Sequence, residues 1–142
     1  MIRLTVPGEP VAQGRPRFST QHGFVRVYDP QKSRTYKDSI RTIALNVIQQ
    51  RFLGPVVMTV DIYRAIPKSW SRKKQEEAEN GFIKPTLKPD VDNYVKSIKD
   101  ALNGIAYVDD SQVVVLIISK HYARQPRVEI VIEEDKHAAS QT

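Results

Sequence analysis

Cysteine is absent from the 142-residue chain. This absence excludes a disulfide framework, a thiol nucleophile and a zinc site built on thiolates, without fixing the cellular compartment. Histidine is scarce as well, because His22, His121 and His137 are the only three and lie far apart. Since they form no HExxH pair, a zinc site is not expected. The sequence also has no Gly-rich Walker or dinucleotide-binding loop.

Long apolar runs are missing too. The longest run extends only from Val113 to Ile118, whereas a transmembrane helix needs about 20 apolar residues. The first residues contain no apolar stretch of signal-peptide length behind a basic start. We therefore expect a cytoplasmic protein without a membrane span.

Length and composition are typical of one globular domain. The chain has a mass of 16.2 kDa, with 40% hydrophobic and 27% charged residues, and single domains most often contain about 100 to 150 residues. We expect the domain to cover residues 1–134, followed by a polar, disordered tail over 135–142.

Positive charge is concentrated in the first third of the chain. Residues 1–51 contain nine Lys and Arg against three acidic residues, whereas residues 52–142 contain 13 of each sign. The whole net charge of +6 therefore lies in the first 51 residues. A basic region attached to a neutral body is suited to a polyanion such as nucleic acid.

Hydrophobic periodicity predicts an α/β (α+β) domain in which helices pack on a mixed β-sheet. Strands are expected over 2–6, 24–28, 56–66, 112–122 and 127–133. Helices are expected over 30–51, 69–79 and 90–103. Asp29 is a plausible N-cap for the first helix, and the Pro- and Gly-rich segment 9–19 is expected to be a loop. The last two strands are expected to form an antiparallel pair.

The third predicted helix carries acidic and basic side chains on its polar face. Asp92, Lys96 and Asp100 follow one another at i, i+4 and i+8, and Asp90 stands at the start of the helix. Because Mg²⁺ prefers oxygen ligands and uses one or two carboxylates, Asp90 and Asp92 could hold this ion. The alternative is ordinary capping and ion pairing on a helix surface.

A second acidic pair, Asp109 and Asp110, precedes the apolar run 113–118. A continuous apolar run is typical of a strand that is buried on both faces. Carboxylates next to such a strand could meet a neighbouring helix end, although adjacent acids are also common in simple turns.

Several basic side chains could contact nucleic-acid phosphates. They are Arg15, Arg17, Arg26, Arg72, Lys73 and Lys74. The last three lie next to Trp70, which could stack on a base, although a solvated helix face is the alternative. The alternatives are that the Gly14 to Arg17 segment is only a solvated loop, or that Arg15 pairs with an acid of the active site.

Taken together, the motifs resemble the RusA family of Holliday junction resolvases. That family's pattern contains Asp-x-Asp-Asn, a lysine four residues after the second Asp, then Asp-Ala-Leu and Asp-Asp-x-Gln-Val. These elements are found here in the same order at 90–93, Lys96, 100–102 and 109–113. The resemblance covers Met1 to about Glu134, and Gly14 to Arg17 is similar to the phage and prophage branch.

The resemblance implies a small mixed α/β homodimer that cuts four-way DNA junctions with Mg²⁺ during recombination and repair. It implies that Asp90, Asp92 and Asp110 form the metal site and that Lys96 is required for catalysis. The segment 68–88 departs from shorter family members, which puts the transfer of DNA contacts in this region in doubt. A non-catalytic junction-binding or duplex-binding protein and a hydrolase of small phosphate esters remain the alternatives.

Overall fold

The computed structural model describes residues 1–15, 17–21 and 23–139. Its elements are, in chain order, β1 (Ile2–Pro7), β2 (Arg17–Gln21), β3 (Phe24–Tyr28), α1 (Gln31–Val47), β4 (Val56–Ala65), α2 (Arg72–Glu79), α3 (Val91–Leu102), the 3₁₀ turn η1 (Asp110–Gln112), β5 (Val113–Ala123), β6 (Arg127–Glu134) and α4 (Lys136–Ala139). Each predicted strand and helix corresponds to one of these elements. The predicted mixed α+β fold is therefore confirmed.

A four-stranded mixed sheet in the order β1-β6-β4-β5 forms the body of the molecule. β6 pairs antiparallel with β1 and β4, and β4 pairs parallel with β5. The predicted antiparallel pairing of the last two strands is wrong, because β4 lies between them. Three residues, 124–126, connect β5 to β6. They are long enough to pass the end of β4, since two strand spacings measure about 10 Å.

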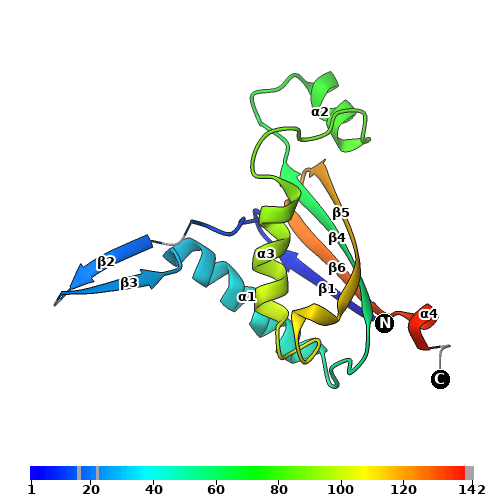
Figure 1. Ribbon diagram of the computed structural model, residues 1–142. Helices are drawn as coiled ribbons and strands as arrows, with labels where there is room; N and C mark the ends of the chain where they lie inside the picture. The colour runs from blue at the N-terminus through cyan, green and yellow to red at the C-terminus, as the bar shows by residue number, and fades with distance from the viewer. Residues whose placement is uncertain (16, 22, 140–142) are drawn as a thin grey trace.

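α1 and α3 pack side by side on the sheet (Figure 1). The core between them and the strands is built from fully buried apolar side chains, among them Ile40, Ala44, Met58, Val60, Ile62, Ile98, Leu102, Ile130 and Ile132. Because α3 buries the side that carries Ile98 and Leu102, its opposite side faces solvent. Asp92, Lys96 and Asp100 are exposed there, as the helical spacing predicts.

α1 differs from its prediction at both ends. Asp29 does not cap it, because Pro30 occupies the N-cap position and no side chain caps the helix. The helix also ends at Val47 rather than near residue 51. The chain turns away there so that the Phe52 N–H can donate to the Ala106 carbonyl at 2.9 Å, which joins the end of α1 to the segment that follows α3.

Two peripheral segments also differ from the sequence prediction. The predicted loop 9–19 ends in a strand, because β2 begins at Arg17 and pairs with β3 in a hairpin that extends away from the body (Figure 1). The tail forms one helical turn, α4, and residues 140–142 lie outside the described residues. No helix in the described part of the chain is long and apolar enough to cross a membrane.

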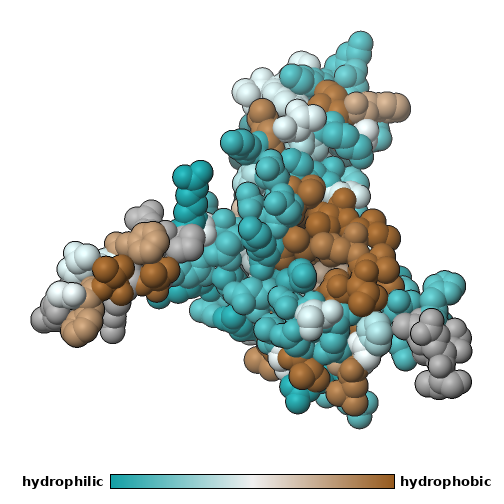
Figure 2. All heavy atoms as spheres, in the orientation of Figure 1, coloured by the Kyte–Doolittle hydropathy of each residue, from teal (hydrophilic) through white to brown (hydrophobic). Residues whose placement is uncertain are grey.

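β5 is an edge strand with exposed apolar side chains. Its run from Val114 to Ile117 is between 38% and 54% exposed, and Figure 2 shows a hydrophobic area between α3 and the edge of the sheet. The expected burial of this run on both faces is therefore not found within one chain. The reason is topological, since α1 and α3 cover the central strands and only one edge of β5 is paired.

Candidate active site

Asp90 and Asp92 lie at the start of α3. Asp90 occupies the N-cap position, and its carbonyl accepts hydrogen bonds from the N–H groups of Asn93 and Tyr94 at 3.2 and 3.4 Å. Its carboxylate makes no capping hydrogen bond, so the capping explanation considered for this side chain does not hold. Asp92 lies in the first turn, where the helix dipole favours a negative charge. Both side chains are exposed.

Asp109 and Asp110 have different roles at η1. The Asp109 carboxylate accepts hydrogen bonds from the N–H and hydroxyl of Ser111. The hydroxyl hydrogen bond is the main reason why the pKa of Asp109 lies below its usual value. Asp109 is thus engaged in the turn. The Asp110 carboxylate makes no hydrogen bond or ion pair with the residues the structure describes, so it is the member of the pair available to bind a ligand.

Asp110 lies at the far end of α3 from Asp90 and Asp92. The turn η1 contacts α3, and Tyr107 between them donates a hydrogen bond to the Lys99 carbonyl in the last turn of that helix at 3.0 Å. Burial is the main reason why the pKa of Tyr107 is raised, and the negative charge of Asp110 is the next largest cause. A helix of 12 residues is about 18 Å long. The structure therefore brings Asp90 and Asp92 together and leaves Asp110 apart.

The three acids do not form a metal site within one chain. Over residues 1–15, 17–21 and 23–139, no group of three or more His, Asp or Glu side chains could hold a metal ion. Asp90 and Asp92 alone are still chemically suitable ligands for Mg²⁺, because they supply exposed carboxylate oxygens without competing partners. Two carboxylates are sufficient for this ion, since it usually keeps several of its waters.

A polar cavity beside α3 contains the predicted catalytic lysine. The cavity has a volume of about 520 Å³ and is lined by Gln13, Gly14, Arg15, Lys37, Asn93, Lys96 and Asp100. Arg15 and Lys96 come from segments far apart in the sequence, and both side chains are exposed. The fold therefore places two exposed cations, Arg15 and Lys96, at one cavity that Lys37 also lines, and each exposed cation could meet the same anionic substrate.

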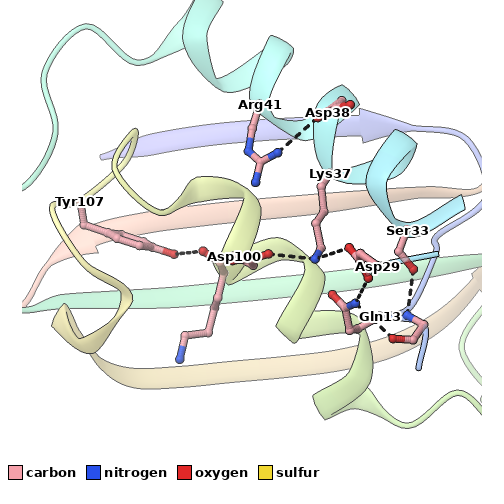
Figure 3. A network of polar contacts seen from close by, with 10 residues as sticks. Gln13, Asp29, Ser33, Lys37, Asp38, Arg41, Asp100 and Tyr107 are labelled. Carbon is pink, nitrogen blue, oxygen red and sulfur yellow. Dashed lines mark hydrogen bonds and ion pairs between the residues drawn. The ribbon is translucent and has the colours of Figure 1, made fainter. Parts of the chain in front are cut away.

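The loop that carries Arg15 is held by a buried lysine that the sequence analysis missed. The Lys37 Nζ lies 2.8 Å from Asp29 Oδ2 and 2.8 Å from Asp100 Oδ2 (Figure 3). Gln13 also donates to Asp29, and the Gly14 N–H donates to Ser33 Oγ at 2.8 Å. This network ties the loop to α1 and α3. No sequence signal could have found it, since Lys37 stands among ordinary polar helix residues.

The charge state of Lys37 follows from these contacts. Burial by itself lowers the pKa of the ammonium group. The hydrogen bonds that Lys37 donates to the carboxylates of Asp100 and Asp29, together with the negative charges of these two groups, outweigh that effect and raise the pKa of Lys37 above its usual value. Lys37 is therefore a stable cation that offsets two carboxylates.

The other predicted DNA contacts lie on two projecting elements. Arg72, Lys73 and Lys74 are exposed on α2, at the end of the sheet opposite η1 (Figure 1). The Lys74 Nζ lies 4.1 Å from the centre of the Trp70 ring, whose edge contacts Tyr122. Trp70 is thus partly engaged within the protein.

Arg17 and Arg26 belong to the β2-β3 hairpin, where Arg26 pairs in register with Ser19. Their side chains lie outside the described residues.

Comparisons with known proteins relate the chain to a family and to a bacterial protein. The family model for endodeoxyribonuclease RusA matches residues 7–133. An uncharacterized protein from Bacillus subtilis (strain 168), YqaN, is 53% identical over 136 residues, which cover 94% of this chain and 96% of that protein.

Proposed function

Because the chain belongs to the RusA endodeoxyribonuclease family, we propose that it is a Mg²⁺-dependent endonuclease that resolves four-way DNA junctions. Its reaction is the hydrolysis of one phosphodiester in each of two opposed strands. We further propose that it acts in recombination and repair, and that its gene belongs to a phage or prophage.

The observation that supports this proposal most strongly is that three acidic side chains have no hydrogen-bond or ion-pair partner among the residues that the structure describes. The carboxylates of Asp90, Asp92 and Asp110 make no hydrogen bond or ion pair with the described part of the chain. Their neighbours Asp29, Asp100 and Asp109 are all engaged. The neighbouring carboxylates of Asp90 and Asp92 repel each other unless a cation joins them, so these two acids, together with the uncommitted Asp110, are the proposed ligands of Mg²⁺.

Hydrolysis requires a water oxygen to form a bond to phosphorus while the bond to one bridging oxygen breaks, and the departing oxygen takes up a proton. When bound, Mg²⁺ supplies Lewis-acid stabilisation of the developing charge. Lys96 lies one helical turn after Asp92 and provides an ammonium group beside the same phosphate, where it stabilises negative charge. Arg15 lines the same cavity as Lys96 and holds the neighbouring backbone phosphate.

A homodimer is part of the proposal, because two opposed strands of a junction are related by two-fold symmetry. A dimer with a two-fold axis supplies two active sites with the same symmetry. Basic residues of the N-terminal third such as Arg17 and Arg26, together with the Arg72 to Lys74 cluster, then hold the DNA arms.

The assay that tests the function compares a four-way junction with a linear duplex of the same sequence, each with Mg²⁺ or with EDTA. We expect paired nicks in the junction with Mg²⁺, little cleavage of the duplex and none with EDTA. Binding of the junction without any cleavage would instead indicate a non-catalytic DNA-binding protein. Turnover of a small phosphodiester without DNA cleavage would indicate a hydrolase of small esters.

Replacing Arg15 by alanine should reduce the salt dependence of junction binding. If Arg15 neutralises one phosphate, the slope of log affinity against log salt should decrease by about 0.9. Affinity can be measured by fluorescence anisotropy between low and moderate salt, with Ca²⁺ in place of Mg²⁺ to prevent cleavage.

The matched control is Arg41→Ala, which removes an arginine that pairs with Asp38 on the surface of α1. Its slope should stay at the wild-type value. An unchanged slope in Arg15→Ala would show that the DNA follows another path, and Arg72, Lys73 and Lys74 would be tested next.

A further inference from the structure

A second cavity adjoins the one that contains Lys96. It has a volume of about 630 Å³, and small-molecule sites typically measure about 300 to 1,000 Å³. Gly14 and Arg15 line both cavities, so the two share a wall. Pro89, the residue before Asp90, also lines the second cavity. The second cavity therefore borders both the arginine of the candidate active site and the start of α3.

One part of the wall of the second cavity is apolar. The side chains there come from the loop after β1 and from the starts of α1 and α3, and they are Pro10, Val11, Ala12, Pro30, Pro89 and Tyr94. Backbone hydrogen bonds hold the loop in place. The Gly8 N–H donates to the Pro126 carbonyl at 3.1 Å, and the loop also contacts α3, where the Gln13 N–H donates to the Asn93 carbonyl at 3.0 Å. The apolar wall is thus formed before any ligand binds.

Tyr94 also brings a polar group to this wall. The residue is only 3% exposed, and its hydroxyl makes no hydrogen bond with the residues that the structure describes. Buried hydroxyls normally have a partner. Burial is the main reason why the pKa of Tyr94 is raised, and the charges of Arg64 and Glu9 act on this pKa as well. Both charged groups line the second cavity, so three polar groups converge there.

The charges at the second cavity favour an anionic ligand. Three cations, Arg15, Lys32 and Arg64, line it together with one acid, Glu9. Arg64 donates one hydrogen bond to the Lys88 carbonyl at 3.2 Å, which fixes its guanidinium group and leaves further N–H groups for a ligand. A ligand that is negatively charged at one end and flat and apolar at the other matches these features.

We propose that the second cavity binds one unpaired nucleotide of the DNA strand that is cut, with the base on the apolar wall and the phosphate at Arg15. The inference rests on the nuclease function proposed above and names the part of the substrate that is recognised beside the scissile phosphate. Base edges carry hydrogen-bond donors and acceptors. Glu9 can accept from such an edge, Arg64 can donate to it, and the Tyr94 hydroxyl can do either.

The continuity of the two cavities favours a DNA strand over a free nucleotide. Neighbouring phosphates of a strand are joined by a sugar that carries one base. When one phosphate lies between Arg15 and Lys96, the adjoining base can enter the second cavity past the shared wall at Gly14 and Arg15. A single strand therefore occupies both cavities at once.

An unpaired base also accounts for the proposed selectivity for junctions. Taking a base out of a helix costs free energy, and the cost is smallest where the base is already unpaired. A strand changes from one helix to another at the branch point, so its bases are less firmly stacked there than within a linear duplex. The second cavity therefore favours cleavage next to the branch point.

Fluorescence of 2-aminopurine tests whether one base leaves the stack. This base analogue is placed at one position at a time on both sides of the cleaved phosphate, and fluorescence is measured with Ca²⁺ in place of Mg²⁺ to prevent cleavage. Because stacking quenches 2-aminopurine, we expect the wild-type protein to raise the fluorescence several-fold at one position and to change it little at the others. No response at any position would overturn the proposal.

Tyr94→Phe tests the cavity itself. The substitution removes a hydroxyl that has no partner in the described part of the chain, so the fold should lose no contact. One hydrogen bond to the base corresponds to about a 2- to 10-fold change in affinity, and junction binding should weaken by that factor. On a junction with an abasic site at the responsive position, wild type and Tyr94→Phe should bind equally well. Equal weakening on both junctions would overturn the cavity as the base site.

The matched control is Tyr63→Phe, which removes a tyrosine hydroxyl on β4 outside both cavities. This variant should bind both junctions as the wild type does. Glu9→Gln, at an exposed loop position, replaces Tyr94→Phe if that variant does not fold, and its effect should depend on the base in the same way. A free mononucleotide should not compete at micromolar concentration, and such competition would overturn the proposal in favour of a site for small nucleotides.

The same experiments separate this inference from the proposed function. If the wild type cuts junctions but no 2-aminopurine position responds, the nucleotide site is refuted and the proposed function stands. If the wild type neither binds nor cuts junctions, the proposed function fails, and the nucleotide site fails with it.

Discussion

Asp92→Asn should abolish Mg²⁺-dependent junction cleavage while junction binding persists. The substitution removes the charge of a proposed metal ligand with little change in shape, at an exposed position that does not contribute to the core. Loss of residues that merely orient metal ligands already costs about 10- to 100-fold, so we expect a decrease of more than about 100-fold. Single-turnover cleavage of a labelled junction measures this effect, and anisotropy in Ca²⁺ measures binding.

The control for this prediction is Asp38→Asn, an exposed acid on α1 that pairs with Arg41 and lies outside the polar cavity. Its cleavage rate should equal that of the wild type. Asp90→Asn and Asp110→Asn should behave like Asp92→Asn. Asp109→Asn should retain cleavage, because its amide oxygen can still accept the hydrogen bonds from Ser111. Cleavage by Asp92→Asn at a rate near that of the wild type would exclude Asp92 as a ligand.

Lys37→Met should lower the free energy of unfolding by about 1 to 3 kcal/mol. Removing one partner of a buried ion pair costs about 3 to 5 kcal/mol, and the half-exposed Asp100 reduces that cost because water screens its charge. Methionine keeps the length of the side chain, so the lost charge accounts for most of the change. Urea denaturation at pH 7 measures the difference.

The pH dependence of that difference follows from the raised pKa of Lys37. A lysine whose pKa is higher in the folded than in the unfolded state stabilises the fold at every pH below the usual lysine pKa. This stabilisation is lost as the pH rises through the folded-state pKa. The gap between wild type and Lys37→Met should therefore be constant from neutral pH to about pH 10 and decrease above it. Lys32→Met, an exposed lysine on the same helix, should differ little from the wild type. A gap that widens at high pH would contradict this account of the network.

Local sequence patterns were sufficient for most of the secondary structure. The spacing of Val95, Ile98 and Leu102 predicted both α3 and its buried side, and α2 ends at Asn80 and Gly81 as its composition indicated. Patterns failed where a distant contact decided the outcome. Asp29 resembles an N-cap in the sequence, yet in the fold its carboxylate meets Lys37.

Sequence order also could not predict the order of the strands. β5 and β6 are consecutive in the chain and separated by a short turn, which favours a hairpin, but β4 lies between them. The alternating buried residues of β4, such as Met58 and Val60, require the covered centre of the sheet. Either β4 or β5 could have paired with β6 in the centre of the sheet. Which of the two strands does so depends on the packing of the whole sheet.

The sequence by itself determined the family and the chemical identity of the candidate site, because the types of residue and their spacing carry that information. Only the tertiary structure decided which acids are free, that Arg15 and Lys96 line one cavity, and that Asp110 lies at the opposite end of α3 from Asp90. Hydrogen-bond partners and distances between segments depend on how the chain folds back on itself. A spacing along the chain therefore specifies neighbours within one helix, but not neighbours across the sheet.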